Sequence, residues 1–488
     1  MKVFVITEGS SFTGFGHLTR CISLYQAFEE RDIQPVFIIN GDETVKEFLQ
    51  DKNHEIFDWI AEEKRLLRYI ENADIIIIDS YLANYELYEK VSKLAKVPVY
   101  IDDNKRIDYP RGIVVNGTIY ADELNYPAKQ DVAYLLGSQY IPIRKEFWDV
   151  PDKEIKENIA TIIITFGGDD ARNMTPGILK LLNENFPKLT KKVIIGKGFK
   201  NIKQIEDLKD DKTDLIYYPD AKGMKKIMLE SDIALSAGGQ TLYELARVSV
   251  PTIAIAVADN QMNNVRGWQK ARFIEYAGWW NENDIFINIT KKIELLQNAD
   301  LREEKSTVGR KFADGLGALR IVSYCIKTFF ENSLVLRKAE PKDMYKIYKL
   351  SNDPDVRKNS FNSDKIKLEN HKIWFLNKLK SGNYFFLVAE INNTFVGQVR
   401  FDINGNEAVI SISMMKQYRG IGMGKFIIKR AIHLLVSDNP DILYVKAYIK
   451  IGNMHSAGFF ESTGFHFVQE IIINGQHAMQ YGYQLKKV

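Results

Sequence analysis

The chain has 488 residues, of which 45% are hydrophobic and 26% charged, and its formal net charge at pH 7 is +3. This length predicts about three domains, and the near balance of charge argues against nucleic acid or a membrane surface as partner. No apolar run approaches the roughly 18 residues needed to cross a bilayer, and the two distant cysteines form no metal-ligand spacing. We therefore expect a cytoplasmic protein without a metal site.

Residues 1–150 and 151–332 carry the same pattern of short apolar runs separated by polar helical segments. In the first block the runs are residues 3–6, 35–39, 75–78, 97–101 and 112–115; in the second they are 160–166, 192–195, 214–218, 233–235 and 251–257. Such series predict doubly wound parallel sheets. We expect two Rossmann-like domains that face a cleft, joined by a charged connector at residues 145–158. A helix at 302–330 would return to the first block.

A glycine turn follows the first predicted strand. Gly14, Gly16 and His17 lie between that strand and a segment with helical spacing, and backbone N–H groups at such a turn suit an anion. Because histidine titrates near neutrality, His17 is the natural candidate for proton transfer in this half. The alternative is that the glycines only form a turn and that His17 caps the helix.

Three further turns follow predicted strands and therefore belong to the same cleft. Gly238, Gly239, Gln240 and Thr241 predict a second phosphate turn, and Glu244 follows one helical turn later, where its carboxylate would accept ribose hydroxyls; the alternative is a solvated Glu244. Gly167, Gly168 and Asp169 form another turn, and Asn260 and Gln261 offer neutral amides to a water or a sugar. Tyr81 follows the predicted strand at 75–78, and we expect it to point toward the same opening. The alternative is that it is an ordinary half-buried aromatic residue.

Residues 333–488 have a different, α+β pattern. Helical segments at 343–352 and 370–380 precede strands at 385–391, 395–402 and 408–414, with a hairpin turn at Asn404-Gly405-Asn406. A glycine-rich turn, Gln417-Tyr418-Arg419-Gly420-Ile421-Gly422-Met423-Gly424, opens a helix at 425–436, and a strand at 443–449 and a helix at 456–462 follow. Such a turn presents successive N–H groups to a pyrophosphate.

The motifs of residues 1–330 jointly resemble a known family. They are Gly14-Phe15-Gly16-His17, Asp79-Ser80-Tyr81, Ile101-Asp102-Asp103, residues 136–140, Thr165 to Asp169, Ala237 to Thr241, and Asn260-Gln261. Together they are similar to the UDP-sugar hydrolase of pseudaminic acid biosynthesis, a family with the GT-B fold. The resemblance implies metal-independent, inverting hydrolysis. It gives His17 the role of activating water, with Tyr81 and Asn260 assisting, and it places UDP near residues 238–244.

The third block resembles the Gcn5-related N-acetyltransferase (GNAT) superfamily. The turn at 417–424, followed by Asn453, Ser456 and Gly464-Phe465, carries this likeness and implies acetyl-CoA as donor. Residues 351–357, 360–362 and 371–375 are similar to the sugar-nucleotide 4-amino N-acetyltransferase of the same pathway. Many members of the superfamily have a leaving-group tyrosine where this chain has Phe460, so the residue that protonates CoA stays open. We expect His371, His433 and His466 to be surface or packing residues.

The interpretation is a bifunctional enzyme of nonulosonic acid synthesis that binds a UDP-linked amino sugar and acetyl-CoA. The GNAT domain would acetylate the 4-amino group of a UDP-linked 2,4,6-trideoxy sugar, and the first two domains would then release UDP. Two alternatives stay open. The first is a GT-B glycosyltransferase that transfers its sugar to an acceptor other than water, since fold does not determine function. The second is a non-catalytic sugar-nucleotide module that serves the acetyltransferase.

Overall fold

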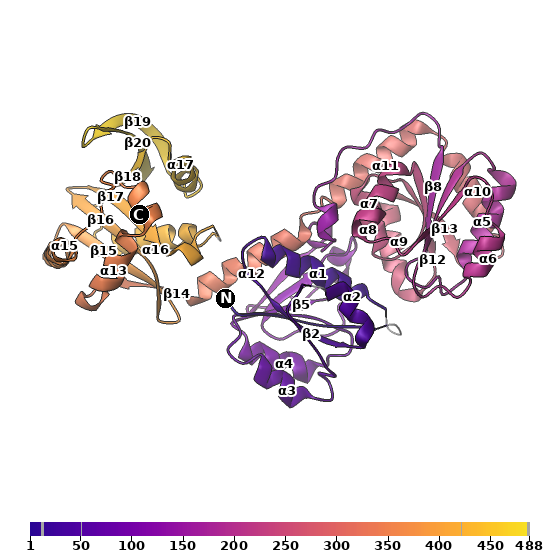
Figure 1. The fold of residues 1–488 in the computed structure, drawn as a ribbon, viewed down its shortest axis with the longest axis horizontal. Helices are drawn as coiled ribbons and strands as arrows, with labels where there is room; N and C mark the ends of the chain where they lie inside the picture. Colours follow the sequence, from indigo (N-terminus) through magenta and orange to yellow (C-terminus); the bar gives the residue numbers. More distant parts are fainter. Residues whose placement is uncertain (11–13, 50, 421, 486–488) are drawn as a thin grey trace. The chain divides into compact units, whose positions relative to one another are not determined.

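The computed structural model describes residues 1–10, 14–49, 51–420 and 422–485 (Figure 1). Thr13, which directly precedes the predicted turn at Gly14, and Ile421, within the predicted turn at 417–424, lie outside the described residues. The chain divides into two compact units, Met1–Cys325 and Ile326–Val488. In the described part, no helix is long and apolar enough to cross a membrane.

The first unit begins with a parallel sheet in the order β3-β2-β1-β4-β5-β6-β7. The strands are β1 (Val3–Gly9), β2 (Val36–Gly41), β3 (His54–Ile56), β4 (Ile75–Asp79), β5 (Val97–Ile101), β6 (Gly112–Asn116) and β7 (Val132–Leu136). The helices between them are α1 (Gly16–Glu29), α2 (Lys46–Leu49), α3 (Glu63–Tyr69) and α4 (Tyr85–Leu94). Every residue of β1, β4 and β5 is buried, because helices cover both faces of the sheet, and this explains their continuous apolar runs.

A second parallel sheet of the same unit has the order β10-β9-β8-β11-β12-β13. Its strands are β8 (Thr161–Thr165), β9 (Thr190–Ile195), β10 (Thr213–Tyr217), β11 (Ile233–Ala237), β12 (Thr252–Ala256) and β13 (Ile274–Trp279). Its helices are α5 (Met174–Asn185), α6 (Ile202–Asp207), α7 (Ala221–Glu230), α8 (Thr241–Arg247), α9 (Met262–Lys270), α10 (Ile285–Leu295) and α11 (Ala299–Phe312). The parallel sheets predicted for both blocks are confirmed.

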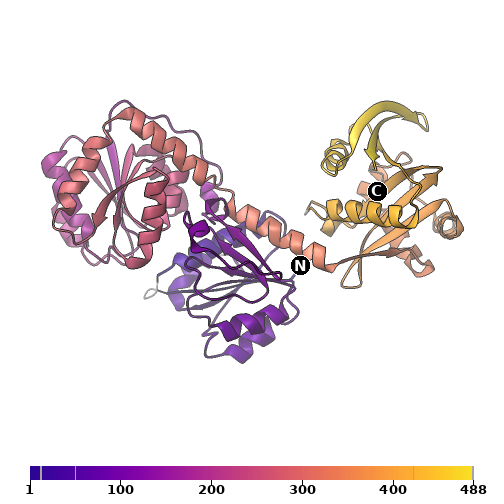
Figure 2. The ribbon, with the colours of Figure 1, turned by 180° about the vertical axis from the view of Figure 1, so that it is seen from behind.

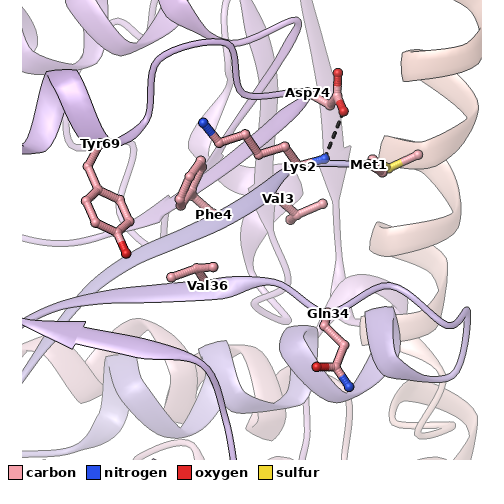
Figure 3. A pocket seen from close by; sticks show the side chains of 8 residues that line it. All are labelled: Met1, Lys2, Val3, Phe4, Gln34, Val36, Tyr69 and Asp74. Carbon is pink, nitrogen blue, oxygen red and sulfur yellow. Dashed lines mark hydrogen bonds between the residues drawn. The ribbon is translucent and has the colours of Figure 1, made fainter. Parts of the chain in front are cut away.

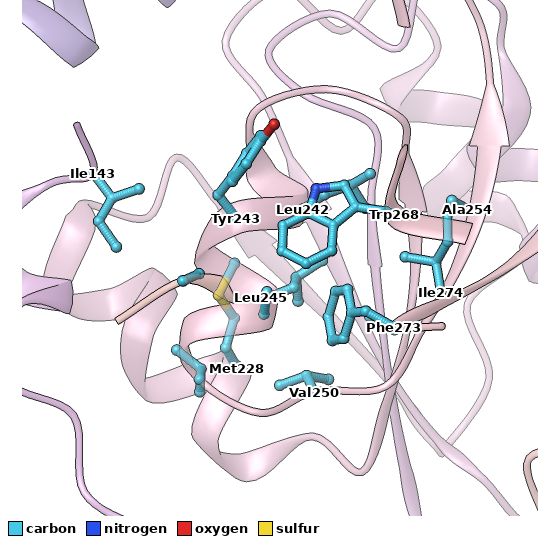
Figure 4. Packing of buried hydrophobic residues seen from close by; sticks show 14 of the residues in the cluster. Ile143, Met228, Leu242, Tyr243, Leu245, Val250, Ala254, Trp268, Phe273 and Ile274 are labelled. Carbon is cyan, nitrogen blue, oxygen red and sulfur yellow. The ribbon is translucent and has the colours of Figure 1, made fainter. Parts of the chain in front are cut away.

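Alternate residues of these strands enter two separate cores, one on each face of the second sheet. Ile163, Ala234 and Ala254 pack with α7, α8 and α9, where Trp268 and Phe273 fill the largest volume (Figure 4). Their neighbours in sequence pack with α5, α6 and α10 on the other face. The helices on the two faces of this sheet are also visible from behind in Figure 2. Burying both faces holds the strand ends, and hence the glycine turns, in place.

The single helix predicted at residues 302–330 is wrong, because the structure has two helices there. The helix α11 ends at Phe312 and α12 runs over Gly317–Ser333. Gly315 has a φ of +87°, and a Cβ at this position would lie 2.7 Å from the carbonyl oxygen of Phe147, so the chain turns sharply where only glycine fits. The predicted return to the first block is confirmed: Arg320 donates to the carbonyl of Gln139, and Arg31 donates to Ser323.

The second unit contains one mixed sheet in the order β14-β15-β16-β17-β18-β20-β19. The strands are β14 (Leu334–Lys338), β15 (Tyr384–Ile391), β16 (Thr394–Asn404), β17 (Glu407–Met414), β18 (Tyr444–Lys450), β19 (His466–Ile473) and β20 (Gln476–Gln484). The helices are α13 (Met344–Ser351), α14 (Pro354–Lys358), α15 (Leu368–Lys380), α16 (Met423–Asp438) and α17 (Met454–Glu461). The predicted hairpin turn is confirmed, with Gly405 at a φ of +59°.

Candidate functional site

The candidate residues of the first sheet lie at its topological switch point. The strand order reverses between β1 and β4, and open sheets of this kind bind ligands beyond the carboxyl ends of such strands. The segment after β1 leads into α1, which places His17 in its first turn, and β4 ends at Asp79 and is followed by Tyr81. Gly14 has a φ of +83°, and Gly16 is the first residue of α1.

His17 is held by a buried carboxylate. The Nδ1 of His17 lies 2.6 Å from Oδ1 of Asp79, whose side chain is fully buried, while the imidazole keeps 19% of its surface exposed. A carboxylate accepts hydrogen bonds only, so Nδ1 carries the proton and Nε2 is left as the basic nitrogen. The 3.1 Å approach of Arg20 Nη2 to the same Nδ1 is then a contact rather than a hydrogen bond, because both atoms are donors.

Arg20 keeps that carboxylate ionised. Its guanidinium donates to both oxygens of Asp79, with Nη2 at 2.6 Å from Oδ1, and its Nη1 donates to Asp103 Oδ1 at 2.7 Å. Burial alone would raise the pKa of Asp79, but the charge of Arg20 and the hydrogen bonds from His17 and Arg20 outweigh it and hold the pKa well below its usual range. Burial, together with the charge of Asp79, raises the pKa of the neighbouring Cys21 thiol.

Tyr81 completes the cluster. Its ring lies edge-on to the His17 ring with centroids 4.5 Å apart, and its hydroxyl donates to Asp103 Oδ2 at 2.8 Å. Its backbone N–H donates to Glu8 at 2.8 Å, and a Glu8 oxygen lies 4.0 Å from His17 Nε2. Burial and the Asp103 charge raise the pKa of the Tyr81 phenol, so the hydroxyl stays protonated and acts as a donor. The cluster thus joins one imidazole, one phenol and three carboxylates around one guanidinium.

The second sheet also places its predicted turns at a switch point, between β8 and β11. Gly167, with a φ of +78°, and Gly168 follow β8, whereas Gly238 and Gly239 follow β11 and lead into α8 at Thr241. A Cβ on Gly238 would lie 2.4 Å from a methyl group of Val265 in α9, so this turn packs too closely for any other residue. Asp170, beside the first turn, caps α5 through the N–H groups of Met174 and Thr175.

Side chains buttress the turn after β11. Asn264 donates to the carbonyls of Gly238 and Gly239 at 2.8 and 3.1 Å. Asn264 in turn accepts from the Tyr243 hydroxyl at 2.7 Å, and that hydroxyl accepts from the N–H of Ile119, which belongs to the first sheet's half, at 2.9 Å. A hydrogen-bonded chain therefore connects the glycine turn to residue 119.

Gln261, Gln240 and Glu244 have intramolecular partners that the sequence did not reveal. The Gln261 side-chain oxygen accepts from the N–H groups of Gly238 and Val257, both at 3.1 Å, so this amide supports the turn. The Gln240 amide donates to the carbonyl of Pro142 at 3.2 Å. The solvated alternative for Glu244 is wrong, because Glu244 is 8% exposed and Arg144 donates to both of its oxygens at 2.7 Å. Asn260 is exposed on a short 3₁₀ helix (Asp259–Gln261).

An open hollow of about 670 Å³ lies elsewhere in the first unit, at the opposite ends of these strands (Figure 3). It is lined by Met1, Lys2, Val3, Phe4, Gln34, Val36, Tyr69 and Asp74. These residues surround the amino ends of β1 and β2. The hollow therefore does not belong to the His17 cluster.

In the second unit, β17 and β18 separate beyond their first residues. The two strands pair in parallel only from Glu407 with Tyr444 to Ile410 with Ala447, so residues 411–414 and 448–450 diverge. The predicted glycine turn follows β17. Gly420 and Gly422 have φ values of +80° and +82°, and α16 begins at Met423. The end of β17 that leads into this turn therefore does not pair with β18.

Arg419 is engaged within the protein rather than turned toward a ligand. Its guanidinium donates to Asp353 and Asp355 of the α14 segment at 3.0 and 2.9 Å and to the carbonyl of Met414 at 2.8 Å. Its N–H donates to Lys416. These contacts of the side chain fix the start of the turn, and the role of Arg419 in binding CoA stays a prediction.

The remaining predicted residues of this unit lie on or around α17, apart from His371 in α15. Asn453 caps α17 by accepting from the Ser456 N–H at 3.2 Å. A Cβ on Gly424 would lie 2.7 Å from the Phe459 ring, so α16 and α17 pack closely. Phe460 is buried against Phe465. Of the histidines expected at the surface or in packing, His371 is buried, with 2% of its surface exposed.

Comparison with known proteins supports both halves of the interpretation. Residues 333–466 match the family model described as an acetyltransferase (GNAT) domain. An uncharacterised protein of Methanocaldococcus jannaschii is 23% identical over 95% of this chain and 96% of its own length. The Campylobacter jejuni UDP-2,4-diacetamido-2,4,6-trideoxy-beta-L-altropyranose hydrolase is 25% identical over 57% of this chain and 99% of its own.

The Helicobacter pylori protein named pseudaminic acid cytidylyltransferase and UDP-2,4-diacetamido-2,4,6-trideoxy-beta-L-altropyranose hydrolase is 23% identical over 54% of this chain and 46% of its own length. These hydrolases match the N-terminal part. The chain therefore joins a segment similar to the hydrolases to a GNAT acetyltransferase domain, as the resemblance in the sequence implied. The two similarities support an enzyme with hydrolase and acetyltransferase activity.

Proposed function

We propose that the chain is a bifunctional enzyme of pseudaminic, or nonulosonic, acid synthesis. Residues 1–150 and 151–332 form the two halves of a UDP-sugar hydrolase in a GT-B arrangement, and residues 333–488 form an N-acetyltransferase. The observation that carries the hydrolase is the pairing of His17 Nδ1 with the buried Asp79 at 2.6 Å, with Arg20 on the same carboxylate. A carboxylate that fixes the imidazole tautomer is the usual support of a histidine base.

Hydrolysis then proceeds by one displacement. His17 Nε2 takes a proton from water as the water oxygen bonds to the anomeric carbon. The bond between that carbon and the UDP oxygen breaks on the opposite face, which inverts the configuration. Tyr81 and Asn260 assist by holding the water and the sugar. Gly14 and Gly16 face the diphosphate from the first half, while Gly168, Gly238, Gly239, Gln240, Thr241, Glu244 and Gln261 form the UDP side.

Acetyl transfer uses the gap between β17 and β18. The turn residues Gly420, Ile421, Gly422, Met423 and Gly424 hold the pyrophosphate of acetyl-CoA, and Asn453 and Ser456 lie at the start of α17 beside it. The neutral 4-amino group of the UDP-sugar attacks the thioester carbonyl; the C–N bond forms, the C–S bond breaks, the nitrogen gives up one proton, and the CoA thiolate takes up one proton and leaves as a thiol. Acetylation comes first, and the shared chain raises the local concentration of the product for the hydrolase.

Mass spectrometry of the purified chain with UDP-4-amino sugars and acetyl-CoA tests this proposal. We expect CoA release, a gain of one acetyl group, and then free sugar plus UDP without any added acceptor. A requirement for a second sugar or another acceptor would favour the glycosyltransferase. Acetylation without UDP release, even from acetylated substrate, would favour the binding module.

A further inference from the structure

A cluster of positive and polar side chains lies on one face of the GNAT sheet. Arg400 and Gln398 project from the same face of β16, since alternate residues of a strand share a face, and in the register of the sheet they lie opposite Ser411 and Ser413 of β17. Arg357 comes from α14 and His371 from α15. The cluster therefore borders residues 411–414, where β17 diverges from β18.

This charge has no counter-ion among the described residues. Neither Arg400 nor Arg357 forms an ion pair there, and Asp402, two residues along β16, is paired with Lys378 instead. Burial and the repulsion from Arg400 lower the pKa of His371 to about 4 and also lower the pKa of Arg357. His371 is therefore neutral near pH 7, but two guanidinium charges without a counter-ion are costly unless an anion joins them.

Several buried polar atoms of the cluster also lack hydrogen bonds. Within the described structure these include His371 Nε2, Gln398 Oε1, Arg400 Nε and Arg357 Nε. His371 is 2% exposed and Gln398 is 4% exposed, so solvent does not readily compensate for the missing bonds. Because buried polar groups in proteins are nearly always paired, a concentration of exceptions at one place points to a bound group.

Aromatic rings form the floor of the cluster. The Arg400 guanidinium lies over the Trp374 ring at 5.2 Å from its centroid. The Trp374 ring is 5.3 Å from that of His371 and 6.4 Å from that of Tyr384. Stacking on an aromatic ring fixes the guanidinium plane, so its two-pronged donor edge is ready for a phosphate.

We propose that this cluster binds the diphosphate of the UDP-linked acceptor, and so selects nucleotide-linked amino sugars over free ones. The assignment rests on the proposed acetyltransferase function for its substrate, but the anion site itself follows from the missing counter-ion and the buried atoms without hydrogen bonds; the other Arg357 nitrogens donate to Ser360 and to the carbonyls of residues 362 and 364. CoA is the other source of phosphate. Its glycine turn leads into α16, which crosses the near face of the sheet in Figure 2. Val399 and Phe401 flank Arg400 in β16. They are therefore directed to the opposite face of the sheet.

The test is isothermal titration of the full chain with UDP. With the proposed hydrolase, wild type binds UDP at two sites and Arg400→Met at one. If the first unit binds no UDP, wild type binds UDP at one site and Arg400→Met binds none. The substitution therefore removes one UDP site whether or not the hydrolase assignment is correct. Saturating CoA should leave the Arg400-dependent site unchanged. Lys378→Met, which removes a neighbouring but already paired cation, is the matched control and should keep every site.

Thermal unfolding separates binding from packing. Removing an unpaired, partly buried charge should leave the unfolding midpoint of ligand-free Arg400→Met at or above that of wild type, whereas a purely structural contact with Trp374 would lower it. Arg400→Lys keeps a cation over the ring but loses the fork, and should weaken UDP at this site about tenfold. An unchanged number of sites and unchanged affinity in both Arg400 variants, or displacement of UDP by CoA, would overturn the proposal.

Discussion

Asp79→Asn separates the two tasks of the buried carboxylate. Asp79 Oδ1 accepts from His17 Nδ1 and from Arg20 Nη2, both at 2.6 Å, while Oδ2 accepts from Arg20 Nε. An asparagine retains one acceptor and turns an N–H toward the other donor, so either His17 or Arg20 loses its partner. Breaking a buried charge pair costs about 3–5 kcal/mol of folding free energy. Because Arg20 also pairs with Asp103, we expect the lower end of that range.

Catalysis should suffer more than stability. Without a fixed tautomer, His17 Nε2 is no longer reliably the base, and we expect UDP release to fall by about 10²–10⁴-fold. The measurement is the rate of UDP formation from acetylated substrate at saturation, below the unfolding temperature of the variant. Asp74→Asn is the matched control, because Asp74 is a largely buried carboxylate that pairs with Lys96 at 2.9 Å near the amino end of β4. Hydrolysis by Asp79→Asn within twofold of wild type would refute the reasoning.

The same variant gives a pH signature. Since the folded pKa of Asp79 is depressed, its contribution to stability is fully present above the unfolded pKa of about 4 and is lost as pH falls through the folded pKa. The difference in unfolding free energy between wild type and Asp79→Asn should therefore be constant from about pH 8 to pH 5 and shrink only in stronger acid. Denaturant titrations at several pH values measure it, and a difference that disappears near neutrality would contradict the ionised, salt-bridged carboxylate.

Three further predictions concern the division of labour. His17→Ala should abolish UDP release, by about 10²–10⁴-fold, and spare acetylation; paired assays of UDP and CoA release check this, and equal loss of both would count against it. Gly422→Asp puts a charge and a side chain at a φ of +82° beside α16 and should stop both steps from the amino sugar while acetylated substrate is still hydrolysed; normal UDP release from unacetylated sugar would reverse the order of steps. Residues 333–488 alone should bind acetyl-CoA and release CoA with the amino sugar, and a folded fragment inactive in calorimetry and thiol assays would show that the activity needs the rest of the chain.

The sheets were predictable because their strands are buried on both faces. Continuous apolar runs such as residues 75–78 are read directly from the sequence and correspond to β4. The final hairpin was missed: β19 (His466–Ile473) is largely exposed, so it lacks the apolar alternation that indicates a strand. The break in the helix at 302–330 was missed because the requirement at Gly315 comes from Phe147, which is distant in sequence.

The candidate site was predictable only where a turn follows a strand. His17 and Tyr81 were expected at one opening, and the structure places their rings together. Arg20 and Glu8 were missed, because Arg20 meets Asp79 across 59 positions and no local spacing records this. A charged residue within the buried stretch of α1 was the available signal, since unpaired charges are rarely buried. The partnership of Arg144 with Glu244 has no signal in one sequence.

The hydrogen-bonded chain from Ile119 through Tyr243 and Asn264 to the glycine turn has a mechanical consequence. A hinge motion that moved Ile119 away would break the hydrogen bond from its N–H to the Tyr243 hydroxyl. The hydrogen bonds from Asn264 to the carbonyls of the glycine turn would then be weakened. The turn would then keep its conformation only while the two halves remain in contact. Ligand binding at this turn and contact between the two halves would therefore be coupled. A movement that opened the site would also weaken the binding of the product there.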